Sequence, residues 1–547
     1  MTAGALALAA ALVMLALALR TQEPRSFEDQ ACSLPGSWLT RIQRGYHEPR
    51  SGQISLLPRY PAYMASGGAG WSHSGPWPYL QEVPLVFYSP GLLGNGQIVD
   101  RDVTLADLAP TTAELIEADL PGVQGRALTE VVDAAGGKKP KLIVTVVWDG
   151  GGRNALELWP DTWPNLARLM DGGISYTNAT DGSSPSVTPA VHSTIGTGVF
   201  PEIHGVTGVP VLDEEGDVVD AFLSGESSRF LEVPTVGELW DEQNEGRAKI
   251  GMLAYEPWHL GMIGHGAERP GGDKDDAVWL NVDTNEWKTN PDHYRLPPSV
   301  EGTTGLAEDI ARLDAADGRV DRSWGDLEIL DDRSRIEETP AFVHFHGRAL
   351  RNMIAEEGYG DDDVTDLLYT NFKQIDRIAH YYNMADRTVG ENLQATDEEL
   401  GALVDYLDQT MDPADWMVVV TADHGMQPDQ AAVDGFGINP REVEDDIDAH
   451  FGAPIARAVW PTEVFLFEDE MESAGITTQE VARYLANYRV SDNAADVETR
   501  VDGTGIFEGD DTVYEMAIPA AMLPDIDCDA GPGAASGQGM AYRMSAP

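Results

Sequence analysis

Residues 418–425 read VVVTADHG, an apolar run that ends in two adjacent metal-ligating side chains, Asp423 and His424. A second apolar run, VTVVWDGGG at 144–152, ends in the same way with Asp149. Short Val-rich runs bounded by glycine are typical of buried parallel strands. In sheets of that kind, functional side chains gather beyond the carboxyl ends of the strands. The two runs therefore predict an α/β fold with a site at one edge of the sheet.

The rest of the chain alternates further apolar runs with helix-like stretches. Strands are expected at IVTVVW (143–148), KIGMLAY (249–255), AFVHF (341–345) and WMVVVTA (416–422), and helices at DTWPNLARLM (161–170) and DEELGALVDYLDQ (397–409). PTEVFLF (461–467) and TTQEVARYLANYRV (477–490) add a strand and a helix. This alternation favours a mostly parallel sheet with helices on both faces.

Composition indicates a large α/β enzyme with an extremely acidic surface. The chain has 547 residues, 42% of them hydrophobic, which is enough for one large domain with inserted cap regions. Its formal charge of −55 argues against binding to the backbone of a nucleic acid, because the field of the protein would repel phosphates. A small-molecule partner is expected instead.

A hydroxyl group precedes a helix-like run in SPSVTPAVHSTIGTGVFPEIHG, residues 184–205. Thr188 stands there in a small-residue turn, where it could be a nucleophile or a structural helix cap, and Ser186 is a rival hydroxyl. Strand-end carboxylates, an Asp-His pair and a hydroxyl at a helix start together indicate metal-assisted phosphoryl transfer.

The helix-like stretch TDLLYTNFKQIDRIAHYYNM, residues 365–384, offers further ligands. Asp376 and His380 are four residues apart, which places both side chains on one helical face. Such a pair alone is more often a surface contact. Between the strand-end ligands Asp149 and Asp423, it predicts a second divalent ion close to the first.

The order and spacing of these residues resemble the alkaline phosphatase superfamily, in its type I phosphodiesterase/nucleotide pyrophosphatase branch. The resemblance rests on Asp149, Thr188, Asp376, His380, Asp423 and His424, and on the pattern Thr188-x3-His192-x4-Thr197-Gly198 with Pro201 and His204-Gly205. It implies a three-layer α/β/α sandwich. It also implies one ion held by Asp149, Asp423, His424 and the nucleophile Thr188, and another held in part by Asp376 and His380. His192 and His204 match family histidines that are interpreted as structural.

The sixth ligand of the family, a histidine, normally follows the Asp-His-Gly element. Here only His450 follows it, in VEDDIDAHFG, which is interpreted as a solvated helix residue. Segments that close the chain in the family instead precede Asp149, at 46–60, 70–91 and 103–116. The resemblance therefore implies a circularly permuted chain, in which His73 is the missing ligand rather than an ordinary loop histidine.

Permutation also implies a role for the two cysteines, Cys32 and Cys528. They flank the segments that an unpermuted chain would join, so a disulfide would restore the lost link; two unrelated buried thiols are the alternative. The expected layout is an anchor or signal-like segment (1–30), a transposed segment (31–135), a linker (136–141), the main catalytic domain (142–527) and a flexible tail (528–547).

The N-terminal apolar run at residues 3–19 is at the short limit for a membrane span and lacks a basic segment before it. We expect it to anchor an extracytoplasmic domain, because an oxidised cysteine pair belongs in such a compartment.

The function implied is a metal-dependent phosphoric ester hydrolase that works through a phospho-threonine intermediate. Two Zn²⁺ ions are expected, with Mn²⁺, Fe or Ca²⁺ as alternatives, and the substrate is a small phosphate ester or a nucleotide. His265 and Lys274 are candidate contacts of the substrate, with a loop role as the alternative. The branch's usual Asn after the nucleophile is absent, with Thr207 and Val209 in that region. Alternatives are an envelope phosphoglycerol- or phosphoethanolamine-type transferase and a non-catalytic metal-binding scaffold.

Overall fold

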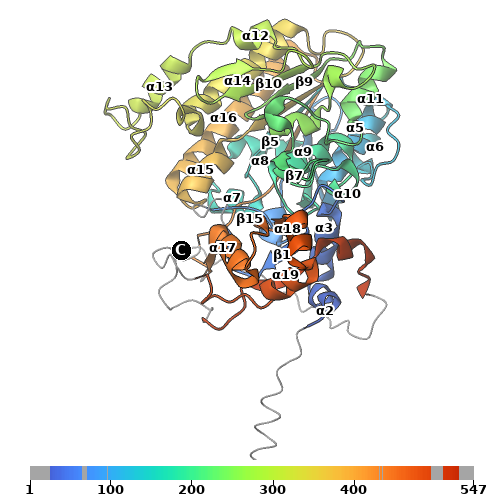
Figure 1. The fold of residues 1–547 in the computed structure, drawn as a ribbon. Coiled ribbons are helices and arrows are strands. Elements are labelled where there is room, and N and C mark those ends of the chain that lie inside the picture. Colours follow the sequence, from blue (N-terminus) through green and yellow to red (C-terminus); the bar gives the residue numbers. More distant parts are fainter. Residues whose placement is uncertain are drawn as a thin grey trace, which may run out of the picture.

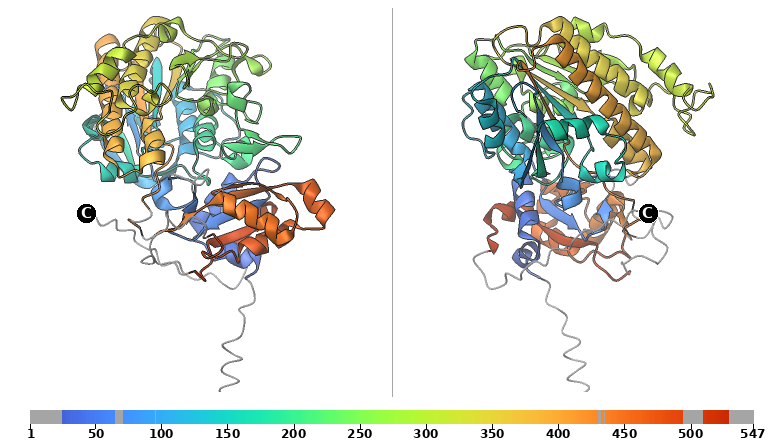
Figure 2. Two further views of the ribbon diagram at one scale, coloured as in Figure 1. Left: turned by 60° about the vertical axis from the view of Figure 1, so that its left-hand side comes forward. Right: turned by 180° about the vertical axis from the view of Figure 1, so that it is seen from behind.

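The computed structural model describes residues 25–64, 71–94, 96–429, 432–433, 435–493 and 509–528. These residues form two bodies, one above the other in Figure 1. The large-sheet body comprises residues 71–94 and 96–429. The small-sheet body combines the blue N-terminal residues 25–64 with the orange and red residues 435–493 and 509–528, and all three views show them together (Figure 2).

The large-sheet body is built on a nine-stranded, mostly parallel sheet. Its strand order is β11-β10-β9-β12-β5-β13-β3-β6-β4. The five adjacent strands β10, β9, β12, β5 and β13 run parallel to one another. Strand β3 is antiparallel to both of its neighbours, and the edge strand β11 is antiparallel to β10. The strands are β3 (Leu85–Tyr88), β4 (Gln97–Thr104), β5 (Leu142–Trp148), β6 (Ile174–Thr180), β9 (Ile250–Leu253), β10 (Asp276–Asn281), β11 (Glu286–Lys288), β12 (Asp366–Phe372) and β13 (Trp416–Thr421).

Helices cover both faces of this sheet. Successive side chains of β5 point to opposite faces, and all of them are buried, so both faces must be covered. Ile143 and Val147 point into one hydrophobic core, and Val144 and Val146 point into the other. The first core is closed by α5 (Leu108–Ile116), α6 (Thr129–Ala135), α9 (Thr188–Thr197) and α11 (Val236–Gln243). The second is closed by α7 (Arg153–Leu158), α8 (Pro164–Gly172), α14 (Pro340–Glu357), α15 (Gln374–Tyr382) and α16 (Arg387–Thr410). The three-layer α/β/α prediction is therefore confirmed.

Two local predictions are wrong. AFVHF was predicted to be a strand but lies inside α14, which begins at Pro340. Apolar side chains continue at helical spacing as far as Ile354, and a segment of five residues is too short to reveal that spacing. The stretch 365–384 is not one helix, because its first half forms β12, buried along its whole length, and only α15 is helical. A continuous apolar run fits a strand covered on both faces as well as it fits a buried helix.

The antiparallel direction of β3 determines what reaches the carboxyl edge of the sheet. In its pairing with β13, Leu85 lies opposite Thr421, the last residue of that strand. The start of β3 and the residues before it therefore lie where the parallel strands end. This brings residues 71–84, including His73, to the edge where the sequence predicts the site.

The small-sheet body is a second three-layer unit. Its sheet has the order β15-β16-β1-β17, with β15 (Ala456–Trp460), β16 (Glu463–Leu466), β1 (Ile54–Pro58) and β17 (Tyr514–Pro519). One face packs against α17 (Pro440–Phe451), α18 (Glu468–Ala474) and α19 (Thr478–Leu485), and the other against α2 (Phe27–Cys32) and α3 (Gly36–Gly45). Strand β1 is antiparallel to both neighbours.

The predicted segments 31–135 and 142–527 each contribute to both bodies, and Cys32 and Cys528 are joined by a disulfide with their Cα atoms 5.4 Å apart. The permuted chain order itself stays a prediction. None of the helices within the described ranges has the length and apolar character to span a membrane. Residues 3–19, the predicted anchor, and nearly all of the predicted tail lie outside the described residues.

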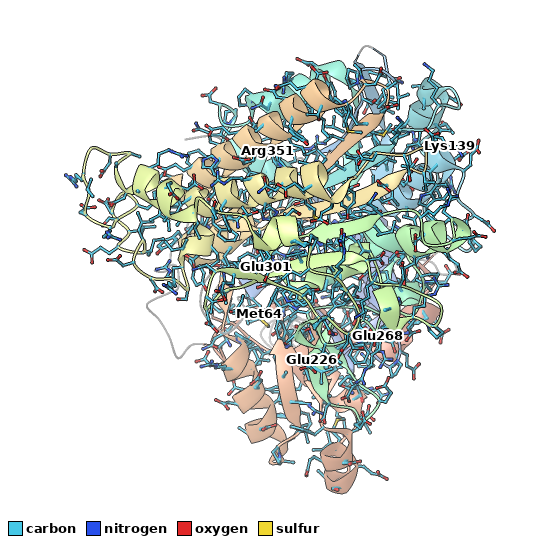
Figure 3. The ribbon with its side chains drawn as sticks, turned by 90° about the horizontal axis from the view of Figure 1, so that it is seen from above. Met64, Lys139, Glu226, Glu268, Glu301 and Arg351 are labelled. Atoms are coloured by element: carbon cyan, nitrogen blue, oxygen red, sulfur yellow. A yellow bond between two sulfur atoms is a disulfide. The ribbon has the colours of Figure 1, made fainter. Side chains whose placement is uncertain are left out.

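The acidic surface is paired in places by arginines and lysines. Figure 3 shows Arg351 beside the packed helices α14 and α16, where its Nη1 donates to Glu399 Oε2 at 2.5 Å. Lys139 lies at the periphery, and its Nζ is 2.7 Å from Glu117 Oε2. Glu399 is buried, whereas the Lys139–Glu117 pair is exposed, and exposed pairs contribute little to stability.

We predict that replacing both cysteines, Cys32→Ser with Cys528→Ser, lowers the free energy of unfolding by on the order of 5 kcal/mol, because the bridge closes a loop of almost the whole chain. Denaturant titration measures the loss. A reductant should shift the midpoint of the wild-type protein and leave that of the double variant unchanged. Equal midpoints for the two oxidised proteins would contradict the prediction.

We also predict a pH-dependent stability centred on Glu463. Its Oε2 accepts a hydrogen bond from the Gly52 amide at 2.7 Å, and burial raises the pKa of this carboxyl to about 7. The folded state therefore retains a proton that the unfolded state loses near pH 4.5, so stability falls as pH rises from about 4.5 to about 7.

The Glu463→Gln variant should lack this loss. Its free energy of unfolding relative to that of the wild type should therefore rise by about 3 kcal/mol as pH increases from 4.5 to 8. Denaturant unfolding of both proteins across this range provides the measurement. Glu472→Gln, an exposed glutamate of the same body, controls for net charge. A constant difference between Glu463→Gln and the wild type at all pH values would rule out the assignment.

Candidate metal centre and nucleophile

The predicted site residues lie at the ends of three neighbouring parallel strands. Asp149 follows β5, and Asp423 follows β13 within two residues. Asp376 lies in the first turn of α15, just after β12. Because β5 is paired with both β12 and β13, these three carboxylates meet at one edge. Gly150, with φ of 70°, makes the turn after β5, and a side chain there would press on Asp376 Cα at 2.9 Å.

The first ligand group consists of Asp149, Asp423 and His424. All three are fully buried, and their ligand atoms lie within 4.8 Å of one another. His424 Nε2 is 3.3 Å from Asp423 Oδ2 and 3.6 Å from Asp149 Oδ1. Burial and the neighbouring Asp423 carboxylate raise the pKa of Asp149 well above its ordinary value, while burial lowers the pKa of His424 to about 3. The group therefore offers a neutral imidazole and crowded carboxylates to a cation.

The second ligand group consists of His73, Asp376 and His380, and its ligand atoms also lie within 4.8 Å of one another. Asp376 Oδ1 is 3.5 Å from His73 Nε2 and 3.2 Å from His380 Nε2. Although burial opposes ionisation, His380 and Lys373 hold the pKa of Asp376 well below its ordinary value. The His73 ring stacks on His424 at 3.5 Å between centroids, so the two groups are adjacent.

The three histidines share one hydrogen-bonding arrangement. Nδ1 of His73 contacts the Ser186 carbonyl oxygen at 2.7 Å, Nδ1 of His380 contacts that of Trp71, and Nδ1 of His424 contacts that of Gly425 at 3.0 Å. A carbonyl accepts only, so each Nδ1 carries the proton. Each Nε2 then offers a lone pair toward the carboxylates, the arrangement usual for metal-ligating histidines.

Unpartnered atoms at the site test whether cations fit it. Among the residues described, Asp376 Oδ1, Asp423 Oδ2 and His424 Nε2 are buried without a hydrogen-bond partner. Three such acceptors in close proximity are costly unless a cation binds between them. Imidazole nitrogens combined with carboxylates suit Zn²⁺ and related divalent ions. The two groups therefore fit two divalent ions.

The hydroxyl of Thr188 is linked to both groups through Lys373, which also contacts Asp149 and Asp376. Thr188 is the first residue of α9, is followed by a helix-starting proline, and lines the cavity described below. Its Oγ1 accepts a hydrogen bond from Lys373 Nζ at 2.9 Å, and the N-cap position of α9 is occupied by Val187 rather than Thr188. The rival Ser186 donates its hydroxyl to the His73 carbonyl oxygen at 2.8 Å and does not line the cavity, so of the two predicted hydroxyls Thr188 is the one at the cavity wall.

Lys373 is a site residue that the sequence reasoning missed. Its buried ammonium group contacts Asp149 Oδ1 at 2.9 Å, Asp376 Oδ2 at 2.8 Å and the Thr188 hydroxyl. Burial works against this charge, but Asp149 and Asp376 raise the pKa of Lys373 above its ordinary value. A lysine at the end of an apolar run, three residues before Asp376 in a lysine-poor chain, is the signal that could have identified it.

A cavity of about 620 Å³ opens over Thr188 and the second ligand group. The large-sheet body contributes Trp71, Trp258 and Tyr381 to its wall, and the small-sheet body contributes Trp460 and Glu463. The site therefore lies where the two bodies meet, with planar side chains from both around it.

Two predicted substrate contacts lie outside this lining. His265 contacts Glu238 Oε1 at 2.9 Å through Nδ1 and the Leu231 carbonyl oxygen at 2.8 Å through Nε2. Lys274 donates to the Pro291 carbonyl oxygen on an exposed loop. Of the candidates, the structure thus brings together Thr188 and both ligand groups but not these two residues.

The histidines interpreted as structural differ in their surroundings. His204 Nε2 is 3.2 Å from Thr194 Oγ1, and its Nδ1 accepts from the Val206 amide, so it holds the turn after α9. His192 instead lies within the site, with Nδ1 3.8 Å from Asp423 Oδ2. His450 lies on α17, where its ring stacks on Tyr484, as the helix interpretation expects.

The chain resembles several known proteins. A protein named calcium-transporting ATPase from Myroides odoratus is 23% identical over 345 residues, which cover 53% of this chain and 60% of that protein. Alkaline phosphatase PafA from Elizabethkingia meningoseptica is 29% identical over 101 residues, 18% of each chain. This chain thus aligns with less than two thirds of the length of either curated relative.

The crystal structure of wild-type alkaline phosphatase PafA superposes with a TM-score of 0.54 at 19% identity, covering 63% of this chain and 76% of that one. This likeness concerns the fold, and it agrees with the mixed α/β sheet described above. The family model described as type I phosphodiesterase / nucleotide pyrophosphatase matches residues 143–520, which is most of the chain. The chain therefore belongs to the type I phosphodiesterase/nucleotide pyrophosphatase family, within the alkaline phosphatase superfamily.

Proposed function

We propose that this chain hydrolyses phosphoric esters at a two-metal site, with Thr188 as the nucleophile. The observation that carries the proposal is the convergence of a cavity-facing hydroxyl with two ligand groups whose histidines all present Nε2. Asp149, Asp423 and His424, together with Thr188, would hold one ion, and His73, Asp376 and His380 the other.

Two bound divalent ions, Zn²⁺ first and Mn²⁺, Fe or Ca²⁺ as alternatives, would neutralise the phosphoryl oxygens and lower the pKa of the attacking hydroxyl. Thr188 Oγ1 forms a bond to phosphorus while the bond to the leaving oxygen breaks. The hydroxyl proton passes to solvent, and the leaving oxygen takes a proton from solvent. Water then cleaves the phospho-threonine, which releases phosphate, or a phosphate monoester from a diester substrate, and restores Thr188.

Lys373 would act on the nucleophile and on the transferred group. Its ammonium group lies 2.9 Å from the Thr188 hydroxyl and is tied to one carboxylate from each ligand group. A fixed positive charge at that point orients Thr188 and attracts the phosphoryl oxygens as negative charge develops on them. This chain lacks the Asn that usually follows the nucleophile in the branch. Lys373 would take the place of that Asn as a hydrogen-bond donor to a phosphoryl oxygen.

The cavity favours a small phosphate ester with a planar group, such as a nucleotide. Trp71, Trp258, Tyr381 and Trp460 offer faces on which a ring can stack, and a volume of about 620 Å³ suits a small molecule. The net charge of −55 works against a nucleic-acid polymer as the substrate. An extracytoplasmic location is supported by the disulfide between Cys32 and Cys528.

Thr188→Ala should abolish turnover of paired aryl phosphate monoester and diester substrates, because no nucleophile remains, while Thr188→Ser should retain measurable turnover. Release of the aryl alcohol in Zn²⁺-loaded protein provides the assay. Bound metal without any turnover by the wild type would favour the scaffold alternative. Transfer of the phosphoryl group only to a lipid or sugar acceptor would favour the transferase.

Lys373→Met should lower kcat by about 10²-fold, the effect typical of losing one donor to developing charge. Lys141→Met is the matched control. Lys141 Nζ is 2.9 Å from Asp415 Oδ2, and neither residue lines the cavity. Steady-state rates at saturating Zn²⁺, with metal content measured in parallel, separate a catalytic loss from a loss of ions. Unchanged kcat in fully loaded Lys373→Met would exclude the role.

A further inference from the structure

Three aspartates meet at the amino edge of the large sheet, opposite the edge that carries the first and second ligand groups. Asp241 lies in the last turn of α11, which precedes β9, and Asp273 and Asp275 lie just before β10. Because β9 and β10 are parallel neighbours, these residues lie where both strands begin. In Figure 1, α11, β9 and β10 are labelled in the part of the large-sheet body that points away from the small-sheet body. None of the three aspartates lines the cavity over Thr188.

The three carboxylates are spaced as ligands of one cation. Their ligand oxygens lie within 4.8 Å of one another. Oxygens about 2.4 Å from a Ca²⁺ ion lie at most about 4.8 Å apart, so the spacing suits a single ion. The turn between α11 and β9 packs against the group, because a Cβ at Gly246 would lie 3.5 Å from Asp273 Oδ2. Main-chain carbonyl oxygens and water usually complete the coordination of such an ion.

An unpartnered carboxyl oxygen points to a ligand, independently of that spacing. Asp241 is only 9% exposed, and its Oδ1 is buried without a hydrogen-bond partner among the described residues. The Ala248 amide interacts with the same carboxyl, but a neutral amide does not cancel its charge. Asp275 is also only 9% exposed, and the charged groups that act on it most strongly, Asp273 and Asp241, are both acidic. Carboxylates are rarely buried in this way unless they are paired or bind a metal ion.

Basic residues that are close in the sequence have other partners. Arg269 Nη2 is 3.2 Å from Glu242 Oε2, and Arg247 Nε donates to a main-chain carbonyl oxygen of its own turn at 3.1 Å. Lys274 stands between two of the aspartates in the chain, yet its ammonium group donates to the Pro291 carbonyl oxygen. None of the three carboxylates forms an ion pair within the described ranges. A cation from outside the chain is therefore required to neutralise the group.

Electrostatic repulsion within the group is correspondingly strong. Burial and the neighbouring Asp273 carboxylate raise the pKa of Asp241 to about 7. Burial, together with Asp273 and Asp241, raises the pKa of Asp275 well above its ordinary value. Like charges this close favour protonation unless a cation is bound between them. A divalent ion would remove the repulsion and allow all three aspartates to ionise.

We propose that Asp241, Asp273 and Asp275 bind one Ca²⁺ ion. The group offers oxygen alone, with neither imidazole nor thiolate, which is the ligand set of a hard cation rather than of zinc. Ca²⁺ accepts about six to eight oxygens in adaptable geometry, whereas Mg²⁺ requires a near-ideal octahedron. The ion would tie the end of α11 to the segment that begins β10, and so fix the part of the sheet that lies beyond β9.

Calcium binding to the full chain tests the proposal without any measurement of turnover. Protein saturated with Zn²⁺ and then desalted is dialysed against radioactive Ca²⁺ in about 1 M KCl, where screening within about 3 Å suppresses loose binding to the acidic surface. The wild type should bind one Ca²⁺ ion per chain, and Asp275→Asn should bind it at least about 10-fold more weakly. Asp363→Asn removes an exposed aspartate from the acidic run 361–363 and should bind Ca²⁺ as the wild type does. Equal affinities of the wild type and Asp275→Asn, or no binding by the wild type, would overturn the proposal.

A crystallographic measurement on the wild type covers the case in which Asp275→Asn does not fold. An anomalous difference map from crystals grown with Ca²⁺ should contain a peak between Asp241, Asp273 and Asp275. A map without a peak at that position would refute the site. All three residues lie outside the first and second ligand groups, so failure of Thr188 as a nucleophile, or of zinc binding, would leave this result unaffected.

Discussion

The buried carboxylates Asp149, Asp376 and Asp423 impose a requirement for positive charge that the rest of the architecture satisfies. They meet at the ends of three adjacent strands, where water is excluded and like charges repel. Lys373 supplies one fixed cation between two of them. Within the described part of the chain, Asp376 Oδ1 and Asp423 Oδ2 remain without a hydrogen-bond partner, and three histidines turn Nε2 toward the carboxylates. Bound divalent ions would supply the remaining positive charge. Binding of the proposed ions would therefore be coupled to folding of this edge.

The antiparallel direction of β3 brings His73 to the second ligand group. If β3 ran parallel to β13, the residues before it would lie at the opposite edge of the sheet, and His73 would be far from Asp376. Its reversed direction places an N-terminal histidine against ligands that lie hundreds of positions later in the chain. The small-sheet body then closes the cavity with Trp460 and Glu463, so both bodies shape the space in which a substrate would bind.

The ends of β5 and β13 were predicted correctly from the sequence. A Val-rich run followed by Asp is typical of a buried parallel strand whose carboxyl end carries a functional side chain. It failed at 341–345 and 365–372, where a short apolar window fits a helix and a buried strand equally well. Lys373 was missed because its role depends on tertiary contacts to Asp149 and Thr188, and its position three residues before Asp376 hints at a site residue without naming those partners. His192 was assigned to structure alone for the same reason, since its neighbour His259 comes from another element.

Strand β1 lies between β16 and β17, which are made hundreds of residues after it. Translation proceeds at about 5–20 residues per second, so this strand waits on the order of tens of seconds for partners on both of its edges. During that interval its unpaired amides and carbonyls are exposed to other chains, which is the usual origin of misassembly. The small-sheet body, and with it the part of the cavity wall that it contributes, can therefore form only after β17 has been made.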